Sequence, residues 1–534
     1  MRNWPIWMAA FALISAPAAA QPSIAHGSTE AARIADIEHL SLAELADAIA
    51  NGQYSSEAIV TAYLLRIAEI DDSGPALNAV IATFPDAIEQ ARAADAERKA
   101  GRYRGPMHGI PILIKDNIEA KGALPTTAGS LALKDNITGR DAPLVAKLRE
   151  AGAIILGKTN LSEWANIRSD NSTSGWSAIG GLTKNPHALD RNTCGSSAGS
   201  GAAMAAGLAA GTIGTETNGS IVCPSSMNGI VGFKPTVGLI SRRHIVPISH
   251  TQDTAGPMTK SVRDAAIMLT AMAGSDPLDP ATQEADKWRG NYAAGLRDDG
   301  LRGVRIGVLR DTIGDDPDLA ALFEKALAQM TAAGAIIIDI ADSRSGLDGI
   351  GEDEGTLLFG ELKYDMAAYL QNLPAGSVPH KTLADLIAFN KANAESELQY
   401  FDQSGFDRAE ATKLTQDQLA ILAKNMTQRT NAHIARLLTQ HNVTLLVQPT
   451  NGRAWLSALG KGDNFSGPSA SSLAAIAGAP HLTVPMGALR GLPVGVSFTG
   501  ARWHDYALLQ AGYAYEQVSR ARVTPTYVNS IGTE

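Results

Sequence analysis

The chain has 534 residues, of which 45% are hydrophobic and 19% are charged, as is ordinary for a globular protein. Its formal net charge is −9 at pH 7. Because a nucleic-acid partner calls for a basic excess that neutralises phosphates, this charge argues against one. The length allows several domains, although large α/β enzymes often form a single one.

The first 20 residues have the pattern of a signal peptide. Arg2 supplies a positive charge, residues 4–13 are apolar, and residues 18–20 are three alanines. We expect cleavage after Ala20, a polar lead-in over residues 21–38, and export to the periplasm or the medium. An uncleaved anchor is the alternative, but the apolar run is shorter than the roughly 20 residues that a span needs. No membrane contact is expected after cleavage.

Helical and strand-like segments alternate along the first part of the chain. Ser41 caps a predicted helix that has Glu44 three residues later and Gly52 at its end. Further elements follow in order: helices over 55–71 and 87–100, a buried strand over 110–116, and a helix then a strand over 144–160. This alternation predicts a mixed α/β sheet with helices on both faces.

Residues 193–226 are almost free of bulky side chains and carry two serine clusters, at 195–197 and 218–220. The small-residue run Ala202 to Ala210 predicts a tightly packed helix. Beyond it we expect a helix over 261–274, strands over 304–311 and 335–340 around a helix over 319–333, and a strand over 442–450. The sequence predicts one large domain over 39–530, with a helical covering region over about 345–440.

Several separated motifs resemble those of the amidase signature family. They are GIPILIKDN (109–117), the serine- and glycine-rich segment 193–226, GIVGFKPTVGLIS (229–241) and the segment 491–517. Within the family, ETNGSIVCPSS (216–226) looks most like the bacterial peptide amidases. The resemblance implies the amidase signature fold, a signature core over about 95–280, and hydrolysis of linear amide bonds through an acyl-enzyme.

The resemblance implies that Ser220 is the nucleophile, Ser196 the serine between, and Lys115 the base, with 24 residues (220 minus 196) separating the two serines. A charged lysine cannot accept a proton, but Lys115 ends an apolar run, and burial lowers a lysine pKa from about 10.4. Neutral Lys115 would draw the proton of Ser196, which draws that of Ser220, and the relay would then reverse to protonate the departing amine. Asp116 would oppose this if it points inward.

The resemblance also implies a cis peptide bond between Gly195 and Ser196. The backbone N–H groups of Thr217, Asn218 and Gly219, with that of the nucleophile, are the expected oxyanion hole. A helix that starts near Ser220 would add a positive dipole end to the site.

The chain departs from the commonest family pattern, Asp-Thr-Gly-Gly-Ser, at Glu216 and Asn218. Asn218 would narrow the pocket or add a polar contact, which favours polar, peptide-like amides. Ser197, Thr215 and Ser174 are expected to support the site by hydrogen bonds, although each is also compatible with an ordinary loop hydroxyl.

Other catalytic patterns fit less well. The segment GSSAG (195–199) matches a nucleophile elbow, but the polar stretch before it is not a buried strand. The eleven histidines show no metal-binding spacing, so we expect neither a metal nor a cofactor. The two cysteines, Cys194 and Cys223, each lie within three residues of a catalytic serine. They form either a disulfide or two buried free thiols.

The sequence therefore predicts an exported amidohydrolase whose partner is a small-molecule or peptide amide, with peptide C-terminal amides the first expectation. An aryl acylamidase and a general small-amide amidase are the alternatives. A catalytically inactive or amidotransferase-type binding subunit is a further alternative. The export signal opposes the amidotransferase role, and the presence of Lys115, Ser196 and Ser220 opposes an inactive protein. Both a monomer and a homodimer are compatible with the sequence.

Overall fold

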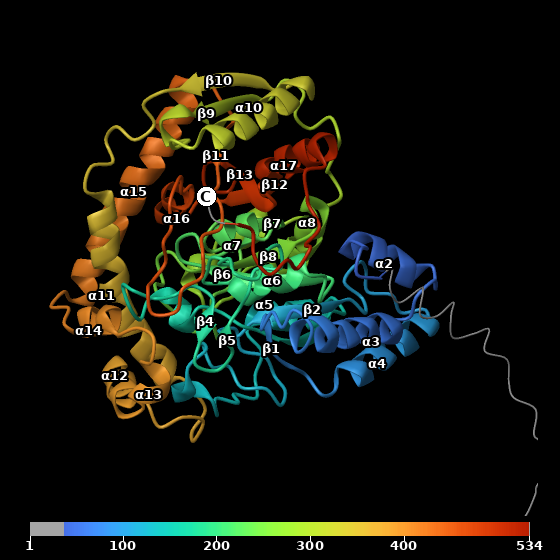
Figure 1. Cartoon of the computed structure of the whole chain (residues 1–534), viewed down its shortest axis with the longest axis vertical. Coiled ribbons are helices and arrows are strands. Elements are labelled where there is room, and N and C mark those ends of the chain that lie inside the picture. Colours follow the sequence, from blue (N-terminus) through green and yellow to red (C-terminus); the bar gives the residue numbers. More distant parts are fainter. Residues whose placement is uncertain (1–36, 533–534) are drawn as a thin grey trace, which may run out of the picture.

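The computed structural model describes residues 37–532. The predicted signal peptide and nearly all of the polar lead-in lie outside the described residues. One mixed sheet of eleven strands runs through the molecule in the order β1-β3-β2-β6-β8-β7-β12-β13-β11-β9-β10 (Figure 1). The sheet strands are β1 (Val80–Thr83), β2 (Pro111–Lys115), β3 (Ile154–Thr159), β6 (Gly211–Glu216), β7 (Val231–Lys234), β8 (Thr254–Thr259), β9 (Arg305–Leu309), β10 (Ile336–Ile340), β11 (Leu445–Pro449), β12 (His481–Leu489) and β13 (Leu492–Thr499).

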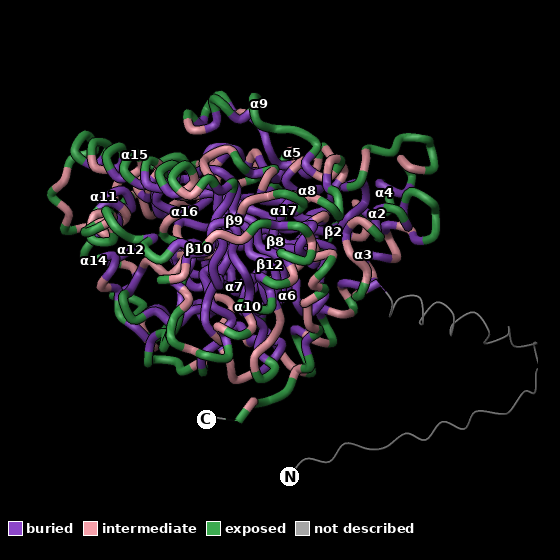
Figure 2. The backbone as a smooth tube through the Cα atoms, turned by 90° about the horizontal axis from the view of Figure 1, so that it is seen from above, coloured by how far each residue is buried: buried purple, intermediate pink, exposed green. Residues whose placement is uncertain are grey.

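Helices cover both faces of this sheet, as predicted. Helices α5 (Pro143–Glu150), α8 (Val262–Met272) and α17 (Asp505–Ser519) pack against one face, while α6 (Ala198–Ala205) and α7 (Val222–Met227) pack against the other (Figure 2). The buried side chains between these layers form one large hydrophobic core. Within residues 37–532, no helix has the length and apolar character needed to cross a membrane.

The predicted local signals of the first part of the chain are present. Ser41 and Glu44 form a reciprocal capping box at the start of α2 (Leu42–Ala50). Helices α3 (Ser56–Arg66), α4 (Ala87–Lys99) and α10 (Pro317–Ala332) also lie where the sequence predicts them. The sequence patterns therefore located these elements correctly.

The predicted helix over Ala202 to Ala210 is wrong in its bounds. The helix in this region, α6, begins four residues earlier and ends at Ala205. Gly207 follows it with φ at 68°, a left-handed conformation that ends helices, and the chain then enters β6. Gly207 is a helix-stop signal that the predicted bounds did not take into account.

The covering region is helical, as predicted, and lies at the left of Figure 1. It comprises α11 (Ile350–Gln371), α12 (Leu383–Ala392), α13 (Ala394–Glu397), α14 (Ser404–Glu410) and α15 (Gln416–Gln440). Helix α15 also packs against α16 (Ser471–Ala477). Leu362, Leu386 and Phe406 of this region pack in one hydrophobic cluster with residues from outside it, among them Leu133 and Trp164.

Candidate active site

The site forms where two neighbouring parallel strands end. Strands β2 and β6 pair in parallel, with Ile114 opposite Ile213, so their carboxyl ends meet at one edge of the sheet. Lys115 is the last residue of β2, and Thr215 is the last but one of β6. The register of this strand pair therefore places the lysine beside the loop that carries Ser220.

Lys115 is fully buried and makes three polar contacts. Its Nζ lies 2.8 Å from Ser196 Oγ, 2.8 Å from Thr215 Oγ1 and 3.3 Å from the Thr215 carbonyl oxygen. Burial lowers the pKa of Lys115 to about 7, although the nearby Asp253 and Glu216 carboxylates act in the opposite direction. At neutral pH a large fraction of this amine is therefore uncharged and able to accept a proton.

Asp116 is also buried, but it forms an ion pair with Lys158 and not with Lys115. Its Oδ1 lies 3.3 Å from the Nζ of the buried Lys158, and its other oxygen accepts hydrogen bonds from the side chain and backbone N–H of Thr127. Asp116 is therefore not one of the carboxylates that raise the pKa of Lys115. Asp253 and Glu216 raise it instead.

The two serine clusters lie side by side. The peptide bond between Gly195 and Ser196 is cis, as the resemblance implied. Ser197 joins the clusters, because its backbone N–H donates to the Ser220 carbonyl oxygen at 3.2 Å and its hydroxyl donates to the Thr215 carbonyl oxygen at 3.1 Å. Ser196 is fully buried, whereas Ser220 is half-buried.

The Ser220 hydroxyl makes no hydrogen bond with any described residue, so the structure brings together Lys115 and Ser196 but does not hydrogen-bond Ser196 to Ser220. Hydroxyls rotate, and catalytic hydrogen bonds are often long or poorly aligned before a substrate binds. The predicted relay therefore requires a hydrogen bond between Ser196 and Ser220 that this structure does not contain.

The backbone from Thr217 to Ser220 has the features of an oxyanion hole. Within residues 37–532, the N–H groups of Asn218, Gly219 and Ser220 donate to no other group. Gly219 has φ at 85°, a left-handed conformation that favours glycine, and a Cβ there would lie 3.2 Å from Ser471 Oγ. These three N–H groups are available to a developing oxyanion.

Helix α7 does not add the expected positive end to the site. It begins at Val222, and the N–H groups of Ile221 and Val222 donate to Glu216 Oε2 at 2.7 and 3.0 Å. A carboxylate therefore already neutralises this helix start. Glu216, which the sequence marked as a departure from the family pattern, acts as the cap of α7.

Gly195 and Ser174 line one cavity together with Asn218 and Gly219. We call residues 217–220, which carry the predicted nucleophile Ser220, the nucleophile loop. A Cβ on Gly195 would lie 2.1 Å from Ser162 Oγ and 3.1 Å from Ser174 Oγ, so no side chain fits there. The Ser174 hydroxyl donates to Asp463 Oδ2 at 2.5 Å, and its backbone N–H donates to Asp463 Oδ1 at 3.0 Å. Ser174 thereby anchors the loop that contains Asp463.

Two cavities border the nucleophile loop. One, of about 210 Å³, is lined by Asn218, Gly219, Gly195 and the aromatic residues Trp455 and Phe465. We call it the acyl-side pocket. Its outer wall comes from the loop over 452–468, which lies far from the serine clusters along the chain.

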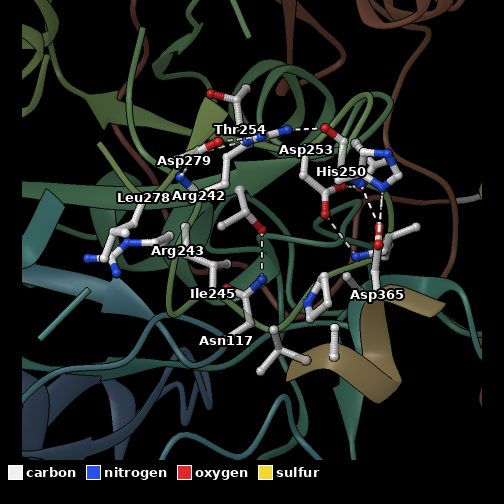
Figure 3. A pocket seen from close by; sticks show the side chains of 17 residues that line it. Asn117, Arg242, Arg243, Ile245, His250, Asp253, Thr254, Leu278, Asp279 and Asp365 are labelled. Atoms are coloured by element: carbon white, nitrogen blue, oxygen red, sulfur yellow. Dashed lines mark hydrogen bonds and ion pairs between the residues drawn. The ribbon is translucent and has the colours of Figure 1, made fainter. Parts of the chain in front are cut away.

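The second cavity, of about 200 Å³, is lined by Thr215, Thr217, Asn117 and Asp253 among others (Figure 3). Asn117 Nδ2 donates to Thr215 Oγ1 at 2.9 Å, so this cavity shares a wall with the Lys115 contacts. The covering region contributes Asp365 and Ala368 to it. The nucleophile loop therefore has a cavity on each of two sides.

Cys194 and Cys223 form a disulfide, which settles the choice that the sequence left open. Cys194 precedes the Gly195–Ser196 bond, and Cys223 follows Ser220 by three residues. The bond therefore ties together the two loops that carry the serines, and it lines the acyl-side pocket.

Sequence reasoning did not identify Asp253, Gln252 and Glu354, which hold residues 217–220 (the oxyanion segment). It also did not identify Asn117, whose amide donates to Thr215 Oγ1. Thr217 Oγ1 donates to Asp253 Oδ1 at 2.5 Å, and Gln252 and Glu354 join the segment by further hydrogen bonds. Asn117 was visible as the last residue of GIPILIKDN, and Gln252 and Asp253 follow closely on the third motif. Glu354 lies in the covering region and carried no sequence signal.

Among the described residues, one group has the geometry to hold a cation: His250, Glu361 and Asp365. His250 Nδ1 lies 2.9 Å from Asp365 Oδ2, and Nε2 lies 3.4 Å from Glu361 Oε1. Glu361 also accepts hydrogen bonds from the Ser249 and Thr251 hydroxyls. The carboxylates are therefore already engaged by protein donors.

The fold and the site together define a class of protein. Its members have a single large α/β domain in which a buried lysine amine contacts a serine hydroxyl beside a glycine-rich loop. The family model described as Amidase matches residues 58–509, and the chain therefore belongs to the amidase signature family. This confirms the resemblance found in the sequence motifs. The chain is an amidohydrolase of that family.

Individual relatives match over almost their whole length. The native peptide amidase from Stenotrophomonas maltophilia is 45% identical, with a TM-score of 0.87 over 91% of this chain and 98% of that chain. A probable amidase of Arabidopsis thaliana is 36% identical over 92% of each chain. A glutamyl-tRNA(Gln) amidotransferase subunit of Moorella thermoacetica is 32% identical over 90% of this chain and 97% of its own.

Proposed function

We propose that this chain hydrolyses peptide C-terminal amides with Ser220 as nucleophile, Ser196 as proton relay and Lys115 as base. The observation that carries the proposal is the 2.8 Å contact between the Nζ of a fully buried lysine and Ser196 Oγ. A lysine whose pKa is lowered to about 7 has the proton affinity that a general base needs at neutral pH.

The proposed steps use the Lys115–Ser196 contact, which is in place, and a Ser196–Ser220 contact that forms when the substrate binds. Lys115 takes the Ser196 proton while Ser196 takes that of Ser220, and Ser220 Oγ forms a bond to the amide carbon. The oxyanion of the tetrahedral intermediate accepts hydrogen bonds from the N–H groups of Asn218, Gly219 and Ser220. The relay then reverses, the C–N bond breaks, and the amine leaves protonated. Water repeats the sequence on the acyl-enzyme and releases the acid.

The acyl-side pocket supports a peptide substrate. Trp455 and Phe465 meet edge to face with ring centroids 5.7 Å apart, and they offer an apolar surface to a peptide side chain. Asn166, Asn451 and Asp463 line the same pocket and offer polar partners to peptide N–H and C=O groups. This mixture suits a peptide better than a long acyl chain, and the likeness to a solved peptide amidase supports the same choice.

A substrate panel tests this proposal. Purified mature protein is given peptide C-terminal amides, anilides and small aliphatic amides at equal concentration, and ammonia or amine release is measured. We expect kcat/KM to be highest for the peptide amides. Higher kcat/KM on anilides or aliphatic amides would replace the peptide assignment by the aryl acylamidase or general amidase alternative. The same peptide with a free C-terminal carboxylate is the control that must release nothing.

A binding role without hydrolysis is the second candidate, because amidotransferase subunits also match this chain. A serine-reactive fluorophosphonate separates the two roles. Labelling of Ser220, read as a mass increase of the intact protein, supports the hydrolase. An unreactive Ser220 supports the binding role.

Export to the periplasm or the medium is also part of the proposal. The disulfide between Cys194 and Cys223 supports it, because such bonds persist in oxidising compartments. When the full chain is produced in a Gram-negative host, we expect soluble protein in the periplasm or medium whose first residue is Gln21. Intact mass of the purified protein measures this. Protein that keeps residues 1–20 and stays in the membrane fraction would contradict the cleavage.

A further inference from the structure

A single carboxylate of the covering region reaches the oxyanion segment. Glu354, on helix α11, accepts hydrogen bonds at Oε1 from Asn218 Nδ2 and from Gln252 Nε2, each at 2.8 Å. Its side chain is largely buried, with a relative exposure of 8%. Asn218 Nδ2 also donates to Ser472 Oγ at 3.1 Å. Thus two side-chain amides, one of them on the oxyanion segment itself, converge on one oxygen atom.

Gln252 links Glu354 to the backbone of the oxyanion segment. Its Nε2 also donates to the carbonyl oxygen of Thr217 at 3.3 Å. In a trans peptide unit the C=O and the following N–H point in opposite directions. Holding the Thr217 carbonyl toward Gln252 therefore turns the N–H of Asn218 away from Gln252, and that N–H is one of the three that donate to no other described group.

The hydrogen bonds also fix which way both side-chain amides face. Each amide uses its NH₂ group for two acceptors, Glu354 with Thr217 for Gln252 and Glu354 with Ser472 for Asn218. Rotation of either amide would place its oxygen against the Glu354 carboxylate. The carboxylate thus acts as the common acceptor that holds both amides in one orientation.

We propose that Glu354 is a positioning residue that orients the oxyanion-hole backbone through Gln252 and Asn218, so that the covering region sets the transition-state geometry of the core. This inference rests on the proposed hydrolysis of amides by Ser220. Glu354 touches neither the reacting serine nor the lysine, so its effect appears in kcat rather than in the attachment of the peptide.

Removal of the carboxylate tests the proposal. Glu354→Ala is expected to lower kcat on a peptide amide by about 10- to 100-fold, because small displacements of catalytic donors have effects of that order. KM is expected to stay within about threefold, since Asn218 keeps its hydrogen bond to Ser472 where it lines the acyl-side pocket. Glu354→Gln keeps an acceptor oxygen and is expected to restore kcat to within about threefold of the wild type. An unchanged kcat in Glu354→Ala, or a change confined to KM, would overturn the proposal.

A double-mutant cycle checks the path through Gln252. If both residues act on the same peptide unit, Gln252→Ala and the double variant lose as much kcat as Glu354→Ala alone, and the losses are not additive. Additive losses would contradict the path. If Glu354→Ala does not fold, Gln252→Ala and Glu354→Gln carry the test: Gln252→Ala must lower kcat, and a wild-type kcat there would overturn the proposal.

Glu397→Ala is the matched control. Glu397 is a buried carboxylate of the same covering region, and it accepts hydrogen bonds from the Ser130 hydroxyl and the Leu131 N–H, away from the nucleophile loop. We expect it to lower the melting temperature but to leave kcat within about twofold. An equal loss of kcat in this control would show that the Glu354 effect comes from general destabilisation, and it would overturn the positioning role.

Fluorophosphonate labelling of Ser220 separates this inference from the proposed function, because the phosphonyl oxygen also meets the oxyanion N–H groups. Slower labelling of Glu354→Ala than of the wild type supports the positioning role even if no tested amide is cleaved. Equal labelling rates would overturn it while leaving amide hydrolysis standing. A wild type that neither cleaves amides nor reacts with the probe would overturn both.

Discussion

Ser220→Ala is expected to lower kcat on peptide amides by roughly 10⁴- to 10⁶-fold, because the variant lacks the atom that forms the acyl-enzyme. The Ser220 side chain is half-buried, and its hydroxyl has no hydrogen bond to any described residue. Its removal should therefore leave the melting temperature within a few degrees of the wild type. Amine release and thermal unfolding of the same preparation measure both quantities.

Ser225→Ala is a suitable control for this variant. Ser225 lies on the next helix, α7, is fully buried, and its hydroxyl has no hydrogen-bond partner among the described residues. It should retain the wild-type kcat. A folded Ser220→Ala protein with more than about one hundredth of the wild-type activity would show that another residue is the nucleophile.

Lys115→Met is expected to lower kcat by roughly 10²- to 10⁴-fold, the usual contribution of a general base. Methionine fills a similar volume but cannot accept a proton. In the proposed mechanism the free enzyme needs Lys115 neutral, and the neutral fraction falls as the pH drops below its pKa of about 7. We therefore expect kcat/KM to decrease about tenfold per pH unit below pH 7 and to level off above it.

A pH profile of both proteins measures this effect. The Lys115→Met profile should lack the rise between about pH 5 and 7, because the group that titrates there has been removed. Wild-type activity that persists unchanged to about pH 5 would rule out Lys115 as the base. A rise that remains in the variant would assign the titration to another group, and the pKa of Asp253, raised by burial to about 6, makes that residue the first to test.

Local sequence signals predicted the strand that ends at Lys115 and several helices of the fold. The apolar run before Lys115 has the length of a buried strand and is one, and the Ser41 capping box, α4 and α8 lie where their patterns indicated. These features depend on neighbours in the chain. The motif resemblance added the pairing of Lys115 with Ser196, which no local pattern contains.

Contacts between distant segments could not be predicted in the same way. Glu354 lies 136 residues from Asn218, and a glutamate in a cluster of acidic residues at the start of a helix is normally solvated. Asp463 lies 289 residues from Ser174, in a loop without periodicity. The stop of α6 depends on one glycine within a run of small residues. Tertiary packing decides the two contacts, whereas the stop of α6 follows from the left-handed Gly207.

The acyl-side pocket takes its distal wall from a loop far along the chain, whereas the lysine and both serines lie between residues 115 and 220. Trp455 and Phe465 can therefore be varied without touching any proton-carrying group. Under the proposed function, a small combinatorial library at these two positions would change which peptide amides are accepted and leave the proposed proton relay intact. For biocatalyst engineering, that separation makes this chain a practical starting scaffold.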